Sequence, residues 1–399
     1  MSDSANVAAA ERGSEVLVGN YAPAPISLVR GEGCFLFDAD GNRYLDLMGG
    51  IATVGLGHGH PRVRAALEAQ AGALWHVSNL YTTEPQIAAA ERIVANSFAE
   101  RVYFCNSGAE ANEAALKLAR RWHHDHGDER HEIVAFHGSF HGRTLFTVST
   151  TGTPAYWEGF GPMVPGVVFA EFGDLASVES VLSDRTAAIL IEPVQGESGV
   201  RPAPPGFLAA LRQLADENGC LLIFDEVQVG MGRTGTLFAH EQHDAVPDVM
   251  TLAKALGNGI PIGAMCTTER FAKALVPGTH ASTFGGNPLA AACADAVLAE
   301  LTEGGVLEHA AQVGAWLDEQ LAAMASRLGD QVLEVRGVGH LRAIELTGPV
   351  GDVITACREQ GVLVIQAGAN NLRLAPPLVI TREELEPGLA VLEAAIAGA

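Results

Sequence analysis

The chain has 399 residues, which at about 150 residues per domain allows two or three domains. Hydrophobic residues make up 48% and charged residues 18%, a composition that excludes disordered, collagen-like and highly charged proteins. The formal net charge of −22 disfavours binding to nucleic acid and to anionic membranes, so we expect small molecules or another protein chain as partners. No run reaches the ~18 apolar residues that a membrane span needs, and the first fifteen residues lack a secretory signal pattern, which predicts a cytoplasmic protein.

The chain offers little for a metal site. Its cysteines are far apart in sequence, with no CxxC pair, and most lie inside apolar runs, which predicts reduced thiols in the core. The histidine-rich stretch at residues 122–131 resembles an exposed helix end and loop, and no cysteine joins it. We therefore expect no metal. The six cysteines are Cys34, Cys105, Cys220, Cys266, Cys293 and Cys357.

The first two thirds of the chain have the pattern of a small β element followed by an α/β domain. Residues 27–48 indicate two short strands around an Asp-Ala-Asp-Gly-Asn turn. From about residue 61, helical stretches alternate with short apolar runs without polar alternation, which is typical of parallel strands covered on both faces. These runs lie at 101–105, 132–136, 187–192, 220–226, 249–256 and 263–268.

After about residue 288 the pattern changes to long amphipathic helices followed by strand-like runs, which predicts a smaller α+β domain joined by the N-terminal hairpin. We divide the chain into an N-terminal segment at 1–60 that packs with the small domain, a large domain at 61–285, and a C-terminal small domain at 286–399.

A possible anion site follows the predicted strand at 101–105. Ser107, Gly108 and Ala109 form a small-residue turn, and a sequence of good helix formers begins at Glu110. Such a turn points backbone N–H groups and the positive end of a helix dipole at one place, which suits a phosphate. An ordinary strand-to-helix turn with an N-cap explains the same pattern.

Asp225 lies at the carboxyl end of a strongly apolar predicted strand, where α/β sheets place ligand-binding residues. A solvated strand-end carboxylate is the simpler interpretation. The GxGxxG pattern at 230–235 does not indicate a dinucleotide loop, because three polar residues separate it from the strand and no clear helical pattern follows it.

Lys254 ends an apolar segment and precedes the flexible sequence Gly257-Asn258-Gly259. A buried lysine has a lowered pKa and can act as a nucleophile, whereas a lysine at a helix end commonly extends into solvent. Considered together, the phosphate turn, the strand-end aspartate and the lysine suit one ligand: an aldehyde cofactor that carries a phosphate and a ring nitrogen.

Several longer motifs then show a resemblance that extends from Tyr21 to Leu378. They are SGAEANEAALKLAR at 107–120, FHGRTLFTVS at 140–149, IEPVQGESGV at 191–200, LIFDEVQVGMGRTG at 222–235, STFGGNPLA at 282–290 and LRLAPPL at 372–378. In these motifs and their order the chain resembles the class III pyridoxal-phosphate (PLP) aminotransferases. The resemblance implies PLP transferase fold type I: an α/β chain with a mainly parallel seven-stranded sheet in the large domain and a smaller α+β domain.

The resemblance also implies roles for the cofactor site. Lys254 resembles the lysine that forms a Schiff base with PLP and later moves a proton, and Asp225 resembles the carboxylate that keeps the pyridine nitrogen protonated. The turn at 107–109 resembles the phosphate cup.

Further residues would complete this cofactor site. Gln228 resembles a hydrogen-bond partner of the phenolic oxygen, Phe140 resembles the aromatic side chain that stacks on the ring, and Glu192 resembles a supporting carboxylate. A core phenylalanine and a structural ion pair are the simpler interpretations of the last two. Thr283 resembles a threonine that reaches the phosphate of a neighbouring subunit, which implies a homodimer.

Three residues are implied in substrate choice. Arg143 resembles the arginine that binds the α-carboxylate of an ω-amine donor, and Arg373 resembles the one that binds the α-carboxylate of glutamate. Glu197 resembles a gate that pairs with Arg373 while the ω-amine is bound. Guanidinium groups suit carboxylates, although a lone arginine is commonly a solvated surface charge. Tyr21 resembles a tyrosine that lines the pocket.

The motifs are most similar to the family branch that transfers the ω-amino group of N2-acetyl-L-ornithine to 2-oxoglutarate, in arginine biosynthesis. Ornithine, succinylornithine, succinyl-diaminopimelate or 4-aminobutyrate as donor, an aminomutase, and a binding protein without catalysis remain open alternatives. The chain departs from the common family pattern at four positions, which leaves the packing there to be determined: Val229, Asn258, His340 and Arg342.

Overall fold

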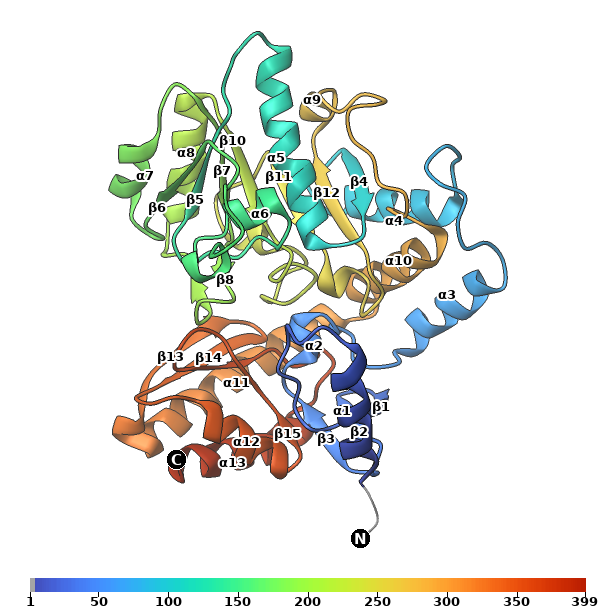
Figure 1. Cartoon of the computed structure of the whole chain (residues 1–399), viewed down its shortest axis with the longest axis vertical. Helices are drawn as coiled ribbons and strands as arrows, with labels where there is room; N and C mark the ends of the chain where they lie inside the picture. The colour runs from blue at the N-terminus through green and yellow to red at the C-terminus, as the bar shows by residue number, and fades with distance from the viewer. Residues whose placement is uncertain (1–3) are drawn as a thin grey trace.

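A seven-stranded sheet forms the centre of the larger domain in the computed structural model, which describes residues 4–399 (Figure 1). The strand order is β4-β12-β11-β10-β7-β5-β6. The five strands from β11 to β6 run parallel, and β12 is antiparallel to both β4 and β11. The predicted mainly parallel seven-stranded sheet is therefore confirmed. The strands are β4 (Arg101–Cys105), β5 (Glu132–Phe136), β6 (Val167–Ala170), β7 (Thr186–Ile191), β10 (Leu221–Asp225), β11 (Val249–Leu252) and β12 (Gly263–Thr267).

Helices cover both faces of this sheet, which explains why its central strands are apolar throughout. In β7, Ala188 and Leu190 contact one core cluster while Ile189 and Ile191 contact another, because successive side chains of a strand point to opposite faces. The first cluster includes α5 (Gly108–Asp125) and α6 (Leu145–Ser149), and the second includes α7 (Leu175–Val181) and α8 (Phe207–Asn218). Burial of both sheet faces therefore explains the apolar runs without polar alternation from which the strands were predicted.

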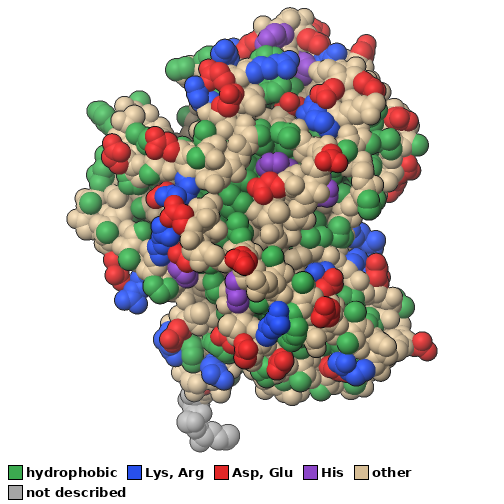
Figure 2. Space-filling model, turned by 180° about the vertical axis from the view of Figure 1, so that it is seen from behind, with side chains coloured by type: hydrophobic (Ala, Val, Ile, Leu, Met, Phe, Trp, Pro, Cys, Tyr) green, Lys and Arg blue, Asp and Glu red, His purple; other side chains and the backbone are tan. Residues whose placement is uncertain are grey.

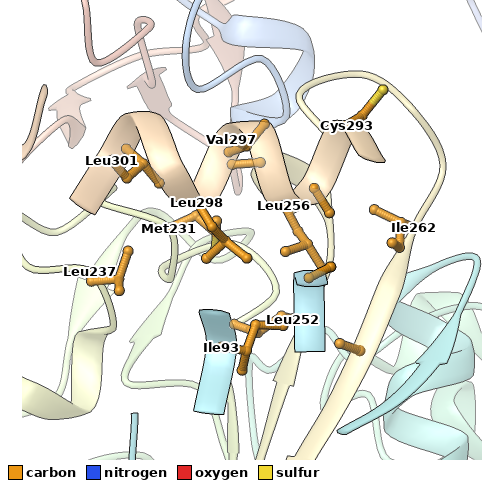
Figure 3. Close-up of a cluster of buried hydrophobic side chains, with 14 of the residues drawn as sticks. Ile93, Met231, Leu237, Leu252, Leu256, Ile262, Cys293, Val297, Leu298 and Leu301 are labelled. Carbon is orange, nitrogen blue, oxygen red and sulfur yellow. The ribbon is translucent and has the colours of Figure 1, made fainter. Parts of the chain in front are cut away.

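A third cluster of buried side chains lies beneath the segment that follows β11. It joins Leu252 and Leu256 to Leu298 and Leu301 of α10 (Pro288–Glu303) and to Ile93 of α4 (Glu84–Ala95) (Figure 3). Helix α10 also packs against α3 (Pro61–Ala71). The boundary that we expected at residue 286 assigns α10 to the small domain, whereas its contacts place it with the core of the large one.

The smaller domain is built on the antiparallel sheet β13-β14-β17-β16, formed by β13 (Val332–Val338), β14 (Leu341–Leu346), β17 (Asn371–Leu374) and β16 (Ile365–Gln366). Helices α11 (Val306–Leu328), α12 (Gly351–Glu359) and α13 (Arg382–Ala397) contribute to its apolar core.

The N-terminal segment packs with this small domain. Helix α1 (Ala5–Val16) precedes three strands, β1 (Leu28–Glu32), β2 (Phe35–Asp38) and β3 (Arg43–Asp46). Strand β3 pairs in parallel with β15 (Val362–Leu363), so the N-terminal strands lie beside the C-terminal domain (Figure 1). Since Leu45 and Leu47 also enter the small-domain core, residues 28–47 belong physically to that unit.

The surface carries its many acidic groups interspersed with Lys and Arg side chains on the face shown in Figure 2. None of the helices within residues 4–399 has the length and hydropathy of a membrane span. The same described residues contain no cluster of three or more His, Cys, Asp or Glu side chains arranged to bind a metal ion. All six cysteines are buried free thiols.

Candidate active site

A cavity of about 430 Å³ opens where strands of the large sheet end. Asn106 follows β4, Glu192 follows β7, Asp225 ends β10 and Lys254 follows β11, and all four line the cavity. Parallel strands bring their carboxyl ends to one edge, so residues distant in sequence meet there. The structure also brings most of the other predicted residues to this cavity: Ser107, Gly108, Ala109, Phe140, Arg143, Glu197 and Gln228.

The N-terminus of α5 forms one wall of the cavity. Ser107 is the N-cap, and its hydroxyl oxygen accepts a hydrogen bond from the backbone N–H of Glu110 at 3.2 Å. The Glu110 carboxylate in turn accepts the backbone N–H of Asn106 at 2.5 Å, which fixes the turn before the helix. The first N–H groups of an 18-residue helix therefore face the cavity, an arrangement that favours an anion such as a phosphate.

Asp225 is buried and held by three hydrogen-bonding partners. Its Oδ2 atom lies 2.7 Å from Nδ2 of Asn112 and 2.7 Å from Nδ1 of His141, and its Oδ1 atom accepts the N–H of Val227 at 3.0 Å. Oγ1 of Thr251 donates to Oδ1 of Asn112 at 2.8 Å, so the amide must present its NH₂ group to Asp225. The carboxylate is thereby fixed in one orientation at the cavity edge.

Sequence reasoning missed Asn112 and His141. Asn112 lies one helical turn after Gly108 and is therefore on the face of α5 that covers the sheet. This spacing could have identified it from the sequence. His141 stands between two predicted site residues. Thr53, which also lines the cavity, comes from the N-terminal segment and had no sequence signal.

Lys254 has a backbone conformation that non-glycine residues rarely adopt, with φ of 47°. Burial lowers the pKa of its amine below the ordinary value, although the carboxylate of Glu197 partly opposes that shift. Burial and the neighbouring Asp225 carboxylate raise the pKa of Glu192 well above its ordinary value. The cavity thus holds an amine shifted toward its neutral, nucleophilic form.

The loop after Lys254 is tied to the N-terminal segment by Asn258, one of the departures from the family pattern. Its Oδ1 atom accepts the N–H of Leu56 at 2.8 Å and its Nδ2 atom donates to the carbonyl of Gly57 at 3.0 Å. Its φ is 48°, a conformation that asparagine tolerates better than most residues. A glycine at this position would lack both hydrogen bonds.

Arg373 of β17 reaches the cavity region from the small domain and is 1% exposed. Its Nη1 atom donates to Oε1 of Glu197 at 2.7 Å and to the carbonyl of Gly196 at 2.9 Å. Nε2 of Gln228 donates to the same Glu197 oxygen at 2.9 Å. Burial alone would raise the pKa of Glu197, but the charges of Arg373 and Lys254 lower it below its ordinary value. The ion pair therefore stays ionised, and Glu197 occupies Nη1 of Arg373.

Arg143 differs from Arg373 in its surroundings. It lines the cavity from the large domain, is exposed, and has no carboxylate partner among residues 4–399. Its guanidinium carbon lies 3.9 Å from the ring centroid of Tyr156 and 5.4 Å from that of Phe140. The arginine is thus positioned by aromatic rings and keeps its donors for a ligand.

Arg373 contacts Glu197 of the cavity wall without lining the cavity itself, and two further predicted residues lie away from it. Tyr21 is 82% exposed and lies outside the cavity wall, so within one chain it does not line the pocket. Thr283 is exposed on a separate surface beside His76 and Gln86. The segment 230–235 consists of turns and a bend and does not begin a helix. This agrees with the interpretation that its GxGxxG pattern is not a dinucleotide-binding loop.

The sequence was compared with protein families, and the aminotransferase class-III model matches residues 18–396. This chain belongs to the class-III aminotransferases. Its relatives include acetylornithine aminotransferase 1 of Bradyrhizobium diazoefficiens, 49% identical over 94% of this chain and 93% of the relative. A succinylornithine transaminase of Yersinia pseudotuberculosis is 46% identical over 95% and 94% of the two chains.

Solved structures give the same result for the fold. Ornithine aminotransferase from Toxoplasma gondii superposes with a TM-score of 0.93 at 32% identity, covering 97% of this chain and 93% of that one. N-acetylornithine aminotransferase from Stenotrophomonas maltophilia has a TM-score of 0.83 at 41% identity, covering 95% and 97%. Fold type I and PLP dependence, both expected from the motifs, are confirmed for this aminotransferase.

The residues of this aminotransferase fit PLP. The buried lysine amine can bind an aldehyde, the start of α5 can bind a phosphate, and the fixed Asp225 carboxylate can accept a ring N–H. Gly108 also fits the role, because a Cβ atom there would come within 2.7 Å of Val227 in the cavity wall. The fit therefore rests on groups with different chemistry on different sides of one cavity.

Proposed function

We propose that this class-III aminotransferase transfers the ω-amino group of N2-acetyl-L-ornithine to 2-oxoglutarate, giving N-acetylglutamate semialdehyde and glutamate in arginine biosynthesis. The observation that carries the proposal is the contrast between its two arginines. Arg143 has no acidic partner within the described chain, whereas Arg373 is paired with Glu197. While the Glu197–Arg373 pair is closed, the cavity can accept a donor with one carboxylate, which Arg143 binds. After the pair opens, it can accept a second substrate with two carboxylates.

The residues around the cavity have distinct roles in this proposal. Lys254 holds the cofactor and moves the proton at the substrate carbon, which its lowered pKa favours. Asp225, oriented by Asn112 and His141, keeps the ring nitrogen protonated. PLP itself supplies an electron-accepting ring for the carbanion character that develops when the proton leaves.

We propose the remaining roles from the positions of the residues around the cavity. We assign the phosphate to Ser107, Gly108 and Ala109, the ring face to Phe140 and the phenolic oxygen to Gln228, with Glu192 as a supporting carboxylate. Arg143 binds the α-carboxylate of acetylornithine, so that the amine at the other end of the substrate reaches Lys254. Tyr21 lies too far out in this conformation to contact that substrate and would need to move or to serve a neighbouring chain.

The Glu197–Arg373 pair acts as a gate between the two substrates. With acetylornithine bound, the pair leaves no unmatched positive charge next to the uncharged carbons beside the ω-amine. With glutamate or 2-oxoglutarate bound, Arg373 must release Glu197 to bind the α-carboxylate. Arginine suits this exchange because its planar fork pairs with either carboxylate.

We also propose that the enzyme is a homodimer with shared sites. Thr283 is exposed away from its own cavity, and apolar side chains next to it are exposed as well: Trp75, Leu80, Tyr81 and Phe284. The side-chain amide of Asn79 donates to the carbonyls of Ser282 and Gly285, so these two segments form one surface. A second copy covering this surface would place Thr283 at the partner's phosphate.

The six buried free thiols support a cytoplasmic location.

Succinylornithine is the second candidate donor, because transaminases with that name are as similar as 46% identity to this chain. Both donors use the same residues and differ only in the acyl group. The test is steady-state kinetics with 2-oxoglutarate and a panel of acetylornithine, succinylornithine, ornithine, 4-aminobutyrate and succinyl-diaminopimelate, with Lys254→Ala as the inactive control. We expect the highest kcat/KM for acetylornithine. A higher value for ornithine or 4-aminobutyrate would contradict the proposal.

A further inference from the structure

Arg233 is a buried arginine at the junction of the two domains, and it lies outside the cavity wall. It is 1% exposed and has no carboxylate within salt-bridge distance among residues 4–399. Its Nε and Nη2 atoms are buried without a hydrogen-bond partner in the described structure. Burying a cation in this state opposes folding, so its presence needs an explanation other than stability.

The side-chain hydrogen bonds that Arg233 makes both cross from the large domain to the small one. Its Nη1 atom donates to the carbonyl oxygens of Pro376 and His340, the latter at 3.3 Å. Its own carbonyl accepts the backbone N–H of His340 at 2.9 Å. One residue of the turn that follows the Asp225 strand therefore holds two separate points of the small domain.

These two residues of the small domain, His340 and Pro376, adjoin neighbouring strands of the sheet that carries Arg373. His340 is in the turn that leads into β14, and Pro376 follows the end of β17. The two strands are paired antiparallel, with Ala343 opposite Arg373. His340 and Pro376 lie at the same end of this strand pair, close to Arg373, and because paired strands move together, an anchor there fixes Arg373 relative to the large domain.

The surrounding atoms leave little freedom at this anchor. A Cβ atom on Gly339 would lie 2.6 Å from the Arg233 carbonyl oxygen, and one on Gly232 would lie 2.7 Å from Leu378. Val229, another departure from the family pattern, is buried here with Leu341 and Ala375. Burial lowers the pKa of Arg233 to about 10, so the group remains charged at neutral pH.

We propose that Arg233 is a positioning residue for the second half-reaction: it sets the distance of Arg373 from the cavity by fixing the small-domain sheet on the large domain. The inference rests on the proposed function, in which Arg373 binds the α-carboxylate of glutamate and 2-oxoglutarate. Arg143 lies on the large domain together with Lys254, so the acetylornithine half-reaction depends less on this anchor than the glutamate half-reaction does. A change at Arg233 must therefore affect the two substrates unequally.

The test is single-turnover kinetics of both half-reactions on the holoenzyme with Arg233→Lys, and with Arg233→Gln if it folds. Lysine keeps the charge but cannot reach both carbonyls in a fixed geometry. We expect kcat/KM for 2-oxoglutarate and glutamate to fall about 10- to 100-fold, mainly through KM, and the value for acetylornithine to change less than about threefold. Equal losses in both half-reactions, or no loss in either, would overturn the proposal.

A matched control and a double mutant separate positioning from a general structural effect. Arg342 is a buried arginine in β14, two residues after His340, but its side chain bonds only within the small domain, to Asp318 at 2.7 Å and to Gly339 at 3.0 Å. Arg342→Lys should lower the unfolding temperature without unequal half-reactions. In an Arg373→Ala background, Arg233→Lys should add no further loss toward 2-oxoglutarate, whereas losses that multiply would contradict action through Arg373.

The same data distinguish failure of the inference from failure of the proposed function. If Arg373→Ala damages the glutamate half-reaction while Arg233→Lys resembles the wild type, only the positioning role is wrong. If Arg373→Ala itself leaves that half-reaction intact, the assignment of Arg373 is wrong and the role of Arg233 falls with it.

Discussion

At the scale of single residues, Asp225 is held in one orientation by hydrogen bonds from two side chains and one backbone N–H. Asn112 is oriented by Thr251, and both Asn112 and His141 lie 2.7 Å from the same carboxylate oxygen. This orientation presents the carboxylate to a ring N–H in the cavity. This arrangement explains how a strand-end aspartate, unremarkable in the sequence, becomes a site residue.

Asp225→Asn should preserve the fold but lower kcat in both half-reactions by about 100-fold or more, because an amide cannot stabilise the protonated ring nitrogen. Asp248→Asn is a suitable control, because Asp248 is a similar carboxylate that pairs with Arg212 at the start of β11. It should affect stability alone. Single-turnover rates for both variants test this, and near-normal deamination by Asp225→Asn would mean that another group holds the nitrogen.

His340, a departure from the family pattern, makes stability depend on pH. Burial and the charge of Arg233 lower its pKa to about 3, and Nε2 lies 2.9 Å from the carbonyl of Ala310. The unfolded chain has an ordinary histidine pKa of about 6.5, so between about pH 6.5 and pH 3 the unfolded state binds the extra proton. Stability contributed by neutral His340 is therefore complete above pH 6.5 and is lost as the pH falls through that window.

Replacing His340 by glutamine should flatten this acid dependence, because an amide can occupy the same site without titrating. The measurement is the urea midpoint of wild type and His340→Gln between pH 7 and pH 4. We expect the difference between the two proteins to change in favour of the variant as the pH falls. A constant difference across the range would show that His340 does not titrate on unfolding.

At the scale of elements, the start of α5 shows how a helix terminus is adapted to a ligand. Ser107 caps the helix, and Gly108 allows the chain to pass close to Val227. The residue after the cap must be small for steric reasons, since a Cβ atom there would come within 2.7 Å of the Val227 side chain. The backbone N–H groups can then face the cavity directly.

Gly108→Ala should weaken PLP binding by about tenfold, because either Val227 or the helix start must shift. Gly72→Ala is the matched control: Gly72 follows α3, its φ is −77°, and a Cβ atom there meets nothing closer than 3.5 Å. Titration of the apoenzyme with PLP, followed by absorbance, measures both affinities. Equal affinities for the two variants would argue that the phosphate binds elsewhere.

The strands could be predicted because burial on both faces leaves a direct signal, an apolar run without alternation. The environment of α10 could not, because an apolar helix face shows that the helix packs but not against which partner. Its side chains meet the segment after β11 (Figure 3), which depends on tertiary structure. The same limit applies to Arg233. Its sequence neighbours contain no signal that its guanidinium group reaches carbonyl oxygens more than 100 residues later in the chain.

At the scale of the whole molecule, the proposed substrate-binding groups are divided between the two domains. Arg143, Lys254 and Asp225 belong to the large domain, Arg373 belongs to the small domain, and Glu197 connects them. Site residues near Lys254 were predictable from motifs because they follow strand ends. Tyr21 and Thr283 were expected at the site too, and their exposure in a single chain is compatible with a role only in an assembly.

The shared-site proposal predicts an obligate dimer. Sedimentation should give at least twice the mass of one chain at assay concentration, and Thr283→Arg, which places a charged bulk on the exposed surface, should yield monomers with low activity. Val276→Arg, at a nearby position that is 48% exposed, serves as a surface-charge control. A fully active wild-type monomer would refute the shared site.

We propose that one cavity serves two substrates because the Glu197–Arg373 pair opens and closes between them. Single-turnover kinetics of both half-reactions on Glu197→Ala and Arg373→Ala test it most directly. Glu197→Ala should weaken acetylornithine turnover while sparing or improving the glutamate half-reaction, and Arg373→Ala should mainly damage the glutamate half-reaction, by about 2 kcal/mol or more in kcat/KM. If Glu197→Ala depresses the two half-reactions equally, the gate does not operate in this enzyme.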